Sequence, residues 1–308
     1  MNEIAPKRAL FIKLGTKGLW EKDCIELNQT LRLGFNEFTH EDCLADKWDM
    51  IRDYYIQQEK RNPKKAGNYV REIQDFYTSS EDVLWITFYQ QMLWWCFADS
   101  QVTGSGNDLK IRKVKGKWQN TTIQGVTLHV DDLSGRLLKK QMYRGTICNI
   151  DCLDYLVRTI NGQELECVTT AKQSLAMLKK SVEGLLRELH QNDFELFADL
   201  LFRASGYQRT GVVGKTQKTK DIELLARLAD ERILVQVKSS STLAEYRGYE
   251  QDFEGLQGYH KFFYVVHSPD SHLSSYVPSN PKIVIWKADK LAELAVNAGL
   301  TEWLIRKI

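Results

Sequence analysis

Residues 221–238, DIELLARLADERILVQVK, constrain the fold more than any other stretch of the chain. In residues 233–238 apolar and polar side chains alternate, which is the pattern of a β-strand with one apolar face. A strand here puts Gln236 and Lys238 on one face and the apolar side chains on the other. The stretch therefore predicts a strand that ends in a polar pair.

A second strand is expected just before it, in residues 221–225. The same alternation places Asp221 and Glu223 on one face of this strand. The polar segment 226–232 suits a hairpin connection between the two strands. We therefore expect the carboxylate at the start of the first strand to meet the polar pair at the end of the second.

The composition is that of a soluble globular protein, with 308 residues, 43% of them hydrophobic and 27% charged. This length suffices for two domains. No apolar run reaches membrane-spanning length and no apolar signal segment follows the charged start, so we expect a cytoplasmic protein with no membrane partner. The net charge of +2 does not by itself indicate that the protein binds nucleic acid, so a prediction of such binding must rest on local clusters of basic residues.

The six cysteines are scattered, and only Cys148 and Cys152 come near the spacing of a metal-binding pair. No second cysteine pair or histidine pair accompanies them, although a structural zinc site usually needs one. Disulfides are rare in a reducing cytosol. We expect buried free thiols.

The first part of the chain mixes short strands with two helices, expected at about residues 44–59 and 69–77 and separated by a break at 62–65. Two aromatic strands, residues 82–89 and 92–98, form a hairpin that indicates the centre of a sheet or small barrel. We expect an N-terminal β-barrel-like domain with helices over residues 1–165.

The basic segment 110–118, KIRKVKGKW, has two interpretations that we weight equally. Lysines commonly protect the edge strands of sheets, so the segment suits a solvated edge strand. It also suits a ribbon in which Lys113 and Lys115 contact phosphates beside an aromatic residue.

The second part, residues 170–308, orders its elements as helices and strands of a mixed α/β domain. A long helix starts near Thr170, with an apolar stripe at Leu175, Leu178, Val182, Leu185, Leu186 and Leu189. A second helix follows, with Asn192 or Asp193 as its N-cap and Gly206 at its end. The fold class expected for the whole chain is therefore α/β (α+β).

The polar ends at Asp221 and Lys238 suit hydrolysis of a phosphodiester, which needs an activated water and a cation for the developing charge. Mg²⁺, or Mn²⁺, accepts carboxylate and carbonyl oxygens, so Asp221 is the expected principal ligand and the Val237 carbonyl a second. Glu223 is equally a further ligand or a solvent-facing carboxylate. Lys238 is placed to orient or deprotonate the water or to stabilise the transition state. The alternative is a surface ion pair between Asp221 and Lys238.

A family resemblance rests on four motifs in order: Phe194-Glu195, Gly206-Tyr207, Asp221-Ile222-Glu223 and Val235-Gln236-Val237-Lys238. Residues 185–290 resemble the PD-(D/E)xK nuclease superfamily, in particular its Mrr-like restriction endonuclease branch, which has Gln before x-Lys. The resemblance implies a central mixed sheet flanked by helices over residues 170–308. It also implies a catalytic set, Glu195, Asp221, Gln236 and Lys238. The chain departs from the branch at residues 215–220, where a Gly-rich lead into the aspartate is usual.

The basic loop before Asp221 contains Arg209, Lys215, Lys218 and Lys220. In a nuclease these side chains would meet DNA phosphates. The alternative is an ordinary solvated loop.

The first domain resembles PUA-type barrels such as the EVE and YTH modules, through Trp20, two helices and the hairpin of residues 82–98. That resemblance implies a domain that reads modified bases, because readers stack an everted base between aromatic side chains. The candidate residues are Trp20, Trp85, Trp94 and Trp118. The alternative for each is a place in the core.

Together these features predict a metal-dependent DNA endonuclease, of a modification-dependent restriction or phage-defence type. Its expected substrate is double-stranded DNA, plain or modified. Cutting both strands takes two active sites, so we expect a homodimer or higher oligomer. The alternatives are an inactive nuclease fold that binds nucleic acid and a nuclease directed at RNA.

Overall fold

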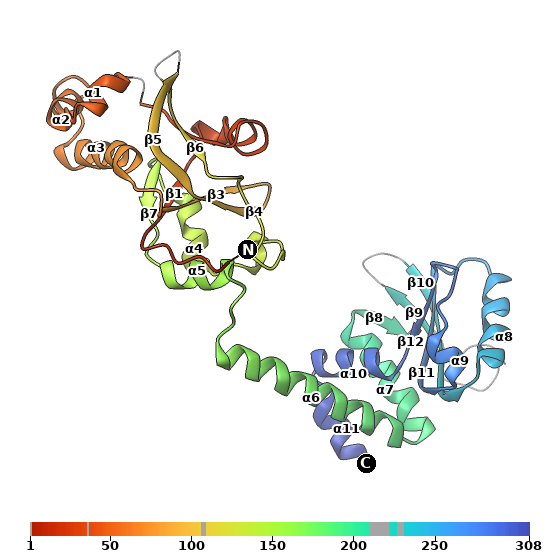
Figure 1. The fold of residues 1–308 in the computed structure, drawn as a ribbon. Helices are drawn as coiled ribbons and strands as arrows, with labels where there is room; N and C mark the ends of the chain where they lie inside the picture. Colours follow the sequence, from red (N-terminus) through yellow and green to blue (C-terminus); the bar gives the residue numbers. More distant parts are fainter. Residues whose placement is uncertain (1, 36, 106–108, 210–221, 227–230) are drawn as a thin grey trace. The chain divides into compact units, whose positions relative to one another are not determined.

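The computed structural model describes residues 2–35, 37–105, 109–209, 222–226 and 231–308. The chain divides into two compact units, Met1–Leu165 and Glu166–Ile308 (Figure 1). Across these described ranges, no helix combines the length and the apolar character needed to cross a membrane. All six cysteines are free thiols; five are buried as expected, whereas Cys167 is exposed.

Unit 1 contains a four-stranded sheet. In spatial order its strands are β4 (Met92–Cys96), β3 (Leu84–Tyr89), β1 (Ala9–Ile12) and β7 (Ile147–Asn149). Strands β3 and β4 form the expected hairpin, with Gln90 and Gln91 at its tip at φ 50° and 59°. Positive φ at both residues matches the twist of a tight hairpin turn, so the hairpin prediction is confirmed.

The second sheet of unit 1 has three strands, in the order β2 (Thr30–Leu33), β6 (Leu109–Val114) and β5 (Ala98–Ser105). Strand β6 is central, so its interpretation as a solvated edge strand is wrong. Alternate side chains point inward, and Lys110 and Arg112 are both fully buried. Arg112 donates hydrogen bonds to the carbonyl oxygens of Phe76, Ser79 and Asp99 at 3.0, 2.8 and 2.7 Å. These bonds make its burial tolerable.

Three helices pack beside these sheets: α1 (His40–Leu44), α2 (Trp48–Gln57) and α3 (Pro63–Thr78). The helix expected at 44–59 is α2, which starts four residues later, because Leu44 instead ends the separate helix α1. The expected break at 62–65 is instead the start of α3, because Asn62 caps the helix and Pro63 occupies its first turn. A π-helix, Asp23–Leu27, precedes β2. The remaining helical segments are η1 (Thr16–Gly18), η3 (Val130–Asp132), α4 (Gly135–Leu138), η4 (Lys139–Met142) and α5 (Leu153–Ile160).

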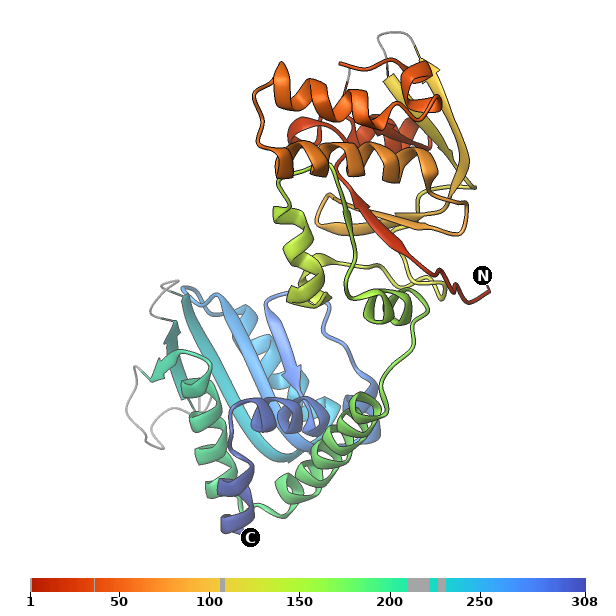
Figure 2. The same ribbon diagram turned by 90° about the vertical axis from the view of Figure 1, so that its left-hand side faces the viewer.

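Unit 2 is built on a five-stranded mixed sheet (Figure 2). Its order is β12 (Ile283–Trp286), β11 (Lys261–Pro269), β10 (Glu231–Ser241), β9 (Ile222–Ala226) and β8 (Tyr207–Arg209). Strands β10, β11 and β12 are parallel, whereas β8, β9 and β10 are antiparallel. The predicted pairing of two neighbouring strands in this stretch is confirmed, and so is the mixed sheet.

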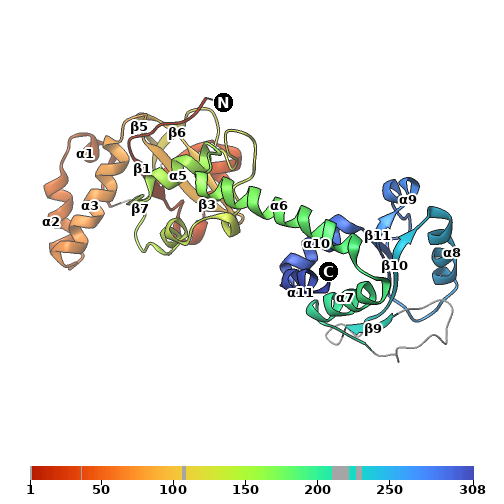
Figure 3. The same ribbon diagram turned by 90° about the horizontal axis from the view of Figure 1, so that it is seen from below.

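Helices cover both faces of this sheet (Figure 3). One face packs on α6 (Glu166–Glu188), α7 (Gln191–Ala204), α10 (Ala288–Asn297) and α11 (Thr301–Lys307). The other packs on α8 (Leu243–Glu254) and α9 (Ser271–Ser275).

Two details of these helices differ from the sequence expectation. The apolar stripe of α6 is only partly in the core, since Val182 and Leu186 are buried but Leu175 and Leu178 are exposed. The N-cap of α7 is His190, whose ring nitrogen accepts from the Asn192 amide, and not Asn192 or Asp193. A ring nitrogen can serve the role of the usual cap oxygen.

Candidate active site

Strand β10 carries the polar pair singled out in the sequence. Its residues Ile233, Val235 and Val237 enter the core shared with α7, whereas Leu234 enters the core shared with α8. Because strand side chains alternate, Gln236 and Lys238 lie on the α8 face. Gln236 is 3% exposed, beside Tyr264 of β11 in the register of the sheet.

Lys238 is held by two side chains of α8. Its Nζ atom lies 3.2 Å from Oε1 of Glu245 and 5.4 Å from the centroid of the Tyr249 ring. Partial burial lowers the pKa of Lys238, but the hydrogen bonds that its ammonium group donates to Tyr249 and Glu245 outweigh this and raise the pKa above its ordinary value. Lys238 is therefore a cation at neutral pH, ready to stabilise negative charge.

The Glu245 carboxylate is held in turn by Ser241, at the end of β10. The hydroxyl of Ser241 lies 2.6 Å from that of Tyr264 and 3.1 Å from Oε2 of Glu245. Burial raises the pKa of Tyr264 to about 12, so the phenol keeps its proton. Ser241, Glu245 and Lys238 thus form a polar chain between the end of β10 and the start of α8.

Sequence reasoning missed Glu245 and Tyr249. A signal for Glu245 exists, because Thr242-Leu243-Ala244-Glu245 has the spacing of a helix capping box. Thr242 does cap α8, accepting from the Glu245 amide at 3.2 Å. The Glu245 carboxylate, however, turns to Lys238 and Ser241.

The first residues of β9 pair with the β10 residues that directly precede Gln236. Ile222 pairs with Val235, and Glu223 pairs with Leu234. Asp221 lies outside the described residues, as do Lys215, Lys218 and Lys220 of the basic loop. The fourth member of that loop, Arg209, ends β8.

Glu195 lies on the helix that covers the opposite face of the sheet from Lys238. Its Oε1 atom accepts from Gln191 at 3.3 Å. The preceding Phe194 packs edge-on against His267 at 4.6 Å, and His267 follows the β11 residue paired with Lys238. Glu195 and Lys238 therefore belong to the same end of the sheet, but their elements cover different faces.

In unit 1, the candidate DNA contacts Lys113 and Lys115 are both exposed. Lys115 forms an ion pair with Glu81, and its hydrogen bond lowers the pKa of that carboxyl. Glu81 thereby offsets the charge of Lys115, whereas Lys113 keeps an outward position on β6.

The four candidate tryptophans have different surroundings. Trp85 and Trp118 are core residues, 0% and 4% exposed, and the Trp118 indole donates to the Thr30 carbonyl at 3.2 Å. Trp94 is half-buried and donates to the Tyr89 carbonyl at 3.1 Å. Trp20 is half-buried and lines a pocket.

A comparison with protein families decides what kind of domain unit 2 holds. Residues 186–295 match the Mrr_cat family model, described as "Restriction endonuclease". Unit 2 contains a restriction endonuclease domain. The match spans α7, the five strands of the sheet and most of α10, and it supports a nuclease role.

Two solved structures also show similarity over most of the chain. One is the DNA modification-dependent restriction endonuclease AspBHI, at 10% identity and TM-score 0.30, covering 73% of this chain and 68% of that one. The other is the MspJI restriction endonuclease in complex with a 27-mer oligonucleotide, at 12% identity and TM-score 0.26, covering 79% and 69%. No curated protein matches the chain.

Proposed function

We propose that this protein is a metal-dependent DNA endonuclease, of a modification-dependent restriction type that acts in phage defence. The observation that carries the proposal is the end of β10. The buried amide of Gln236 lies there, and so does the ammonium group of Lys238, which Glu245 and Tyr249 hold in place. Strand β9, which follows Asp221, pairs with β10, and both strands lie within the span that matches the restriction endonuclease family. An ion pair on a solvated surface would not bury its neighbouring amide.

The donors at this end of the sheet suit a hard divalent cation. They are oxygen atoms: the carboxylate of Asp221, the carbonyl of Val237 and the amide oxygen of Gln236, with Glu223 as a further candidate. Mg²⁺ or Mn²⁺ accepts few protein ligands of this kind and completes its shell with water. In the described part of the chain, no group of three or more His, Cys, Asp or Glu side chains forms a metal site. When bound, the metal would polarise the scissile phosphate and lower the pKa of a water.

Lys238 acts in this proposal as a fixed positive charge and not as a base. Its pKa is raised, so deprotonation at neutral pH would cost free energy. The ammonium group instead donates to a non-bridging phosphate oxygen as charge develops there. Glu245 and Tyr249 hold that group in place, which saves the reorganisation that a free lysine would require.

Glu195 remains a proposed member of the catalytic set. It lies at the same end of the sheet as Lys238, on α7, which covers the opposite face of the sheet. From there it suits a role in orienting water or a second metal ion. The proposed DNA contacts are Arg209, Lys215, Lys218, Lys220, Lys113 and Lys115.

Nicking of supercoiled plasmid tests the metal site. Asp221→Ala should remove Mg²⁺-dependent nicking, because the principal ligand is lost. Asp252→Ala, at an exposed position of α8, is the matched control and should cut like the wild type. Equal nicking by Asp221→Ala and the control would exclude the proposed site.

Cleavage of plain, cytosine-methylated, hydroxymethylated and glucosylated DNA, with a single-stranded RNA alongside, tests the choice of substrate. We expect at least one modified duplex to be cut in preference to plain DNA. Equal cleavage of all four duplexes would end the modification-dependent part of the proposal and leave the nuclease. Sedimentation of the full chain with DNA tests the proposed homodimer or higher oligomer, since cutting both strands takes two active sites.

A further inference from the structure

Unit 1 contains a groove of about 770 Å³ that is lined mainly by cationic side chains, and we call it the basic groove. Residues of α3, of the α4–η4 segment and of β7 line it. Its charged lining residues are four cations, Arg71, Arg136, Lys139 and Lys140, and one acid, Asp151. None of these residues belongs to the nuclease site or to the DNA contacts proposed above.

Three of the four cations come from one short stretch of sequence. Residues 136–144, RLLKKQMYR, contain four cationic residues and no acid. Arg136, Lys139 and Lys140 have the i, i+3 and i+4 spacing of one helix face, and the chain is helical here, through α4 and then η4. Leu137, which lies off that face, is 0% exposed. The leucine therefore anchors the segment in the core, and the cations stay on its outer side.

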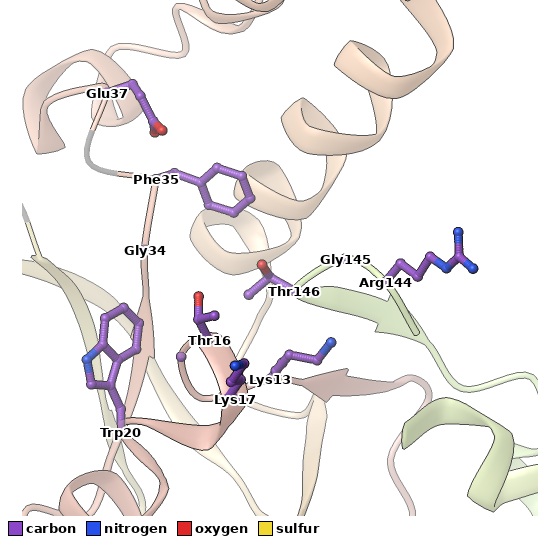
Figure 4. A pocket seen from close by; sticks show the side chains of 11 residues that line it. Lys13, Thr16, Lys17, Trp20, Gly34, Phe35, Glu37, Arg144, Gly145 and Thr146 are labelled. Carbon is purple, nitrogen blue, oxygen red and sulfur yellow. The ribbon is translucent and has the colours of Figure 1, made fainter. Parts of the chain in front are cut away.

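The fourth cation of this stretch, Arg144, follows the lining residue Tyr143 in the chain. It is exposed, and Figure 4 shows its side chain pointing away from Trp20 and Phe35. No ion pair with another residue that the structure describes neutralises Arg144. It therefore extends the positive charge from the basic groove along the segment before β7.

The two guanidinium groups of the groove are fixed by uncharged acceptors. Arg71 on α3 donates from Nη2 to the Tyr143 hydroxyl at 3.0 Å and to the Ile147 carbonyl at 3.3 Å. Arg136 donates from Nη2 to the Asp151 carbonyl at 2.8 Å. These bonds tie α3 and α4 to the segments on either side of β7. The groove and two of its charges are thus in place before a ligand binds, which lowers the entropy cost of binding.

Two acids offset part of the positive charge. The Asp151 carboxylate lies 3.1 Å from Nζ of Lys140, and its side chain is 62% exposed. The Glu72 carboxylate, 3.8 Å from Arg71, is 1% exposed and accepts from the Thr146 amide at 2.7 Å, so the fold itself uses it. Across the described ranges, Arg136 and Lys139 enter no ion pair. An excess of positive charge therefore remains.

The other titratable groups of the groove add no negative charge. Burial raises the pKa of the Cys148 thiol to about 11. Burial, and then the hydrogen bond to Glu72, raise the pKa of Tyr143 to about 12. Both groups keep their protons at neutral pH, so the groove stays cationic there.

The exposure of the lining indicates the shape of the ligand. Arg136, Lys139 and Asn149 are exposed, and the Met142 side chain beside them is 82% exposed. A site for a small molecule usually buries about 70–90% of its ligand, which an open lining of this kind does not do. A polymer with regularly spaced negative charges can lie across such a surface and meet several cations at once. Lysine, arginine and asparagine side chains all contact phosphate oxygens.

We propose that the basic groove holds the sugar–phosphate backbone of duplex DNA, with Arg71, Arg136, Lys139 and Lys140 contacting phosphate oxygens. Such contacts position a duplex without reading its bases, so they add affinity that does not depend on sequence or base modification. This assignment rests on the proposed function, because it takes DNA as the substrate.

Fluorescence anisotropy of the full chain with a labelled plain duplex, in EDTA to prevent cleavage, measures the affinity over about 50–200 mM KCl. Each phosphate contact contributes about 0.9 to the slope of log K against log salt concentration. Lys139→Gln should therefore lower that slope by about 1 and weaken binding by about tenfold at about 100 mM KCl, and the double variant with Arg136→Gln should lower the slope by about 2. Lys47→Gln, at an exposed lysine of unit 1 outside the groove, is the matched control and should keep the wild-type slope.

Asp151→Asn should act in the opposite direction. It removes the acid that offsets Lys140, so binding should tighten by about two- to fivefold, the range expected for an exposed ion pair. A variant that failed to fold would not gain affinity, so this result separates an effect on charge from an effect on structure. Asp154→Asn, at an exposed position of α5 outside the groove, is its control and should bind like the wild type.

Two competitors identify the source of the phosphates. Free ATP should displace the labelled duplex only weakly, because it cannot span the groove's cations as a backbone does. Strong displacement by ATP would overturn the assignment in favour of a site for free polyphosphates. Tighter binding of duplex RNA than of duplex DNA, with the same dependence on Lys139, would overturn it in favour of RNA.

Plasmid nicking in Mg²⁺, run alongside, separates this proposal from the nuclease proposal. If Lys139→Gln, the double variant and Asp151→Asn all bind DNA like their controls while the wild type nicks, the groove proposal fails and the nuclease proposal stands. If the three variants shift as expected while the wild type does not nick, the groove proposal stands and the nuclease proposal fails.

Discussion

His267 should make unit 2 lose stability in mild acid. Its ring is 5% exposed, packs on Phe194 at 4.6 Å and has Nδ1 2.9 Å from the Ser268 hydroxyl. Nε2 is buried and has no hydrogen-bond partner among the residues described. Burial, and then the positive charge of Arg187, lower the pKa of His267 from 6.5 to about 4.

The sign and size of the effect follow from proton linkage. A pKa that is lower in the folded state means that the unfolded chain binds the proton first as the pH falls. Stability is therefore unaffected well above pH 6.5 and declines as the pH falls toward 4. The whole shift is worth about 3 kcal/mol, of which about 2 kcal/mol is lost by pH 5.

Urea unfolding of the full chain at pH 7.5, 6 and 5 measures this loss in the transition of unit 2. His267→Leu should be less stable than the wild type at pH 7.5 but should lose about 2 kcal/mol less on going to pH 5. His272→Leu removes an exposed histidine of the same unit and is the control. If His267→Leu and wild type lose stability in parallel, the histidine is not buried in its neutral form and the reasoning is refuted.

Three further predictions concern the contact between Glu245 and Lys238 in unit 2 and the surroundings of Lys110 and Glu72 in unit 1. Glu245→Gln should slow nicking by about tenfold, because second-layer partners that orient an active group have effects of this size; Glu254→Gln, at an exposed site on the same helix, should not. Lys110→Met should lower the free energy of unfolding of unit 1 by about 3 kcal/mol, since two buried carbonyls lose a charged donor; Lys113→Met on the same strand should stay within about 0.5 kcal/mol. Gly145→Ala should destabilise unit 1 by about 1–3 kcal/mol through overlap with Glu72, whereas Gly67→Ala in α3, with open space around it, should stabilise it slightly. Thermal and urea unfolding check the last two, and unchanged stability of Lys110→Met or Gly145→Ala would contradict them.

The elements that the sequence predicted well depend on local pattern. Alternation predicted the strand with Gln236 and Lys238, and the polar segment before it predicted the antiparallel partner. Gly206, at φ +86°, ends a helix as expected, because that conformation favours glycine. In each case the cause lies within a few residues of the effect.

The features that were missed depend on contacts between distant segments. Lys110 and Arg112 were interpreted as surface residues, but they are buried because carbonyl groups of α3, β5 and the loop after β2 converge on them. Likewise, Glu245 has the spacing of a helix cap, and only the packing of α8 on the sheet turns its carboxylate toward Lys238. No local pattern distinguishes such charges from solvated ones.

The initial rate of Mg²⁺-dependent plasmid nicking by Lys238→Ala tests the central claim most directly. The wild type should nick with Mg²⁺ and stop in EDTA, and Lys238→Ala should lose at least about a hundredfold in rate, as expected when a fixed charge on the transition state is removed. Lys261→Ala, at the exposed start of the neighbouring strand, should nick at the wild-type rate. Equal rates for Lys238→Ala and Lys261→Ala would contradict the account.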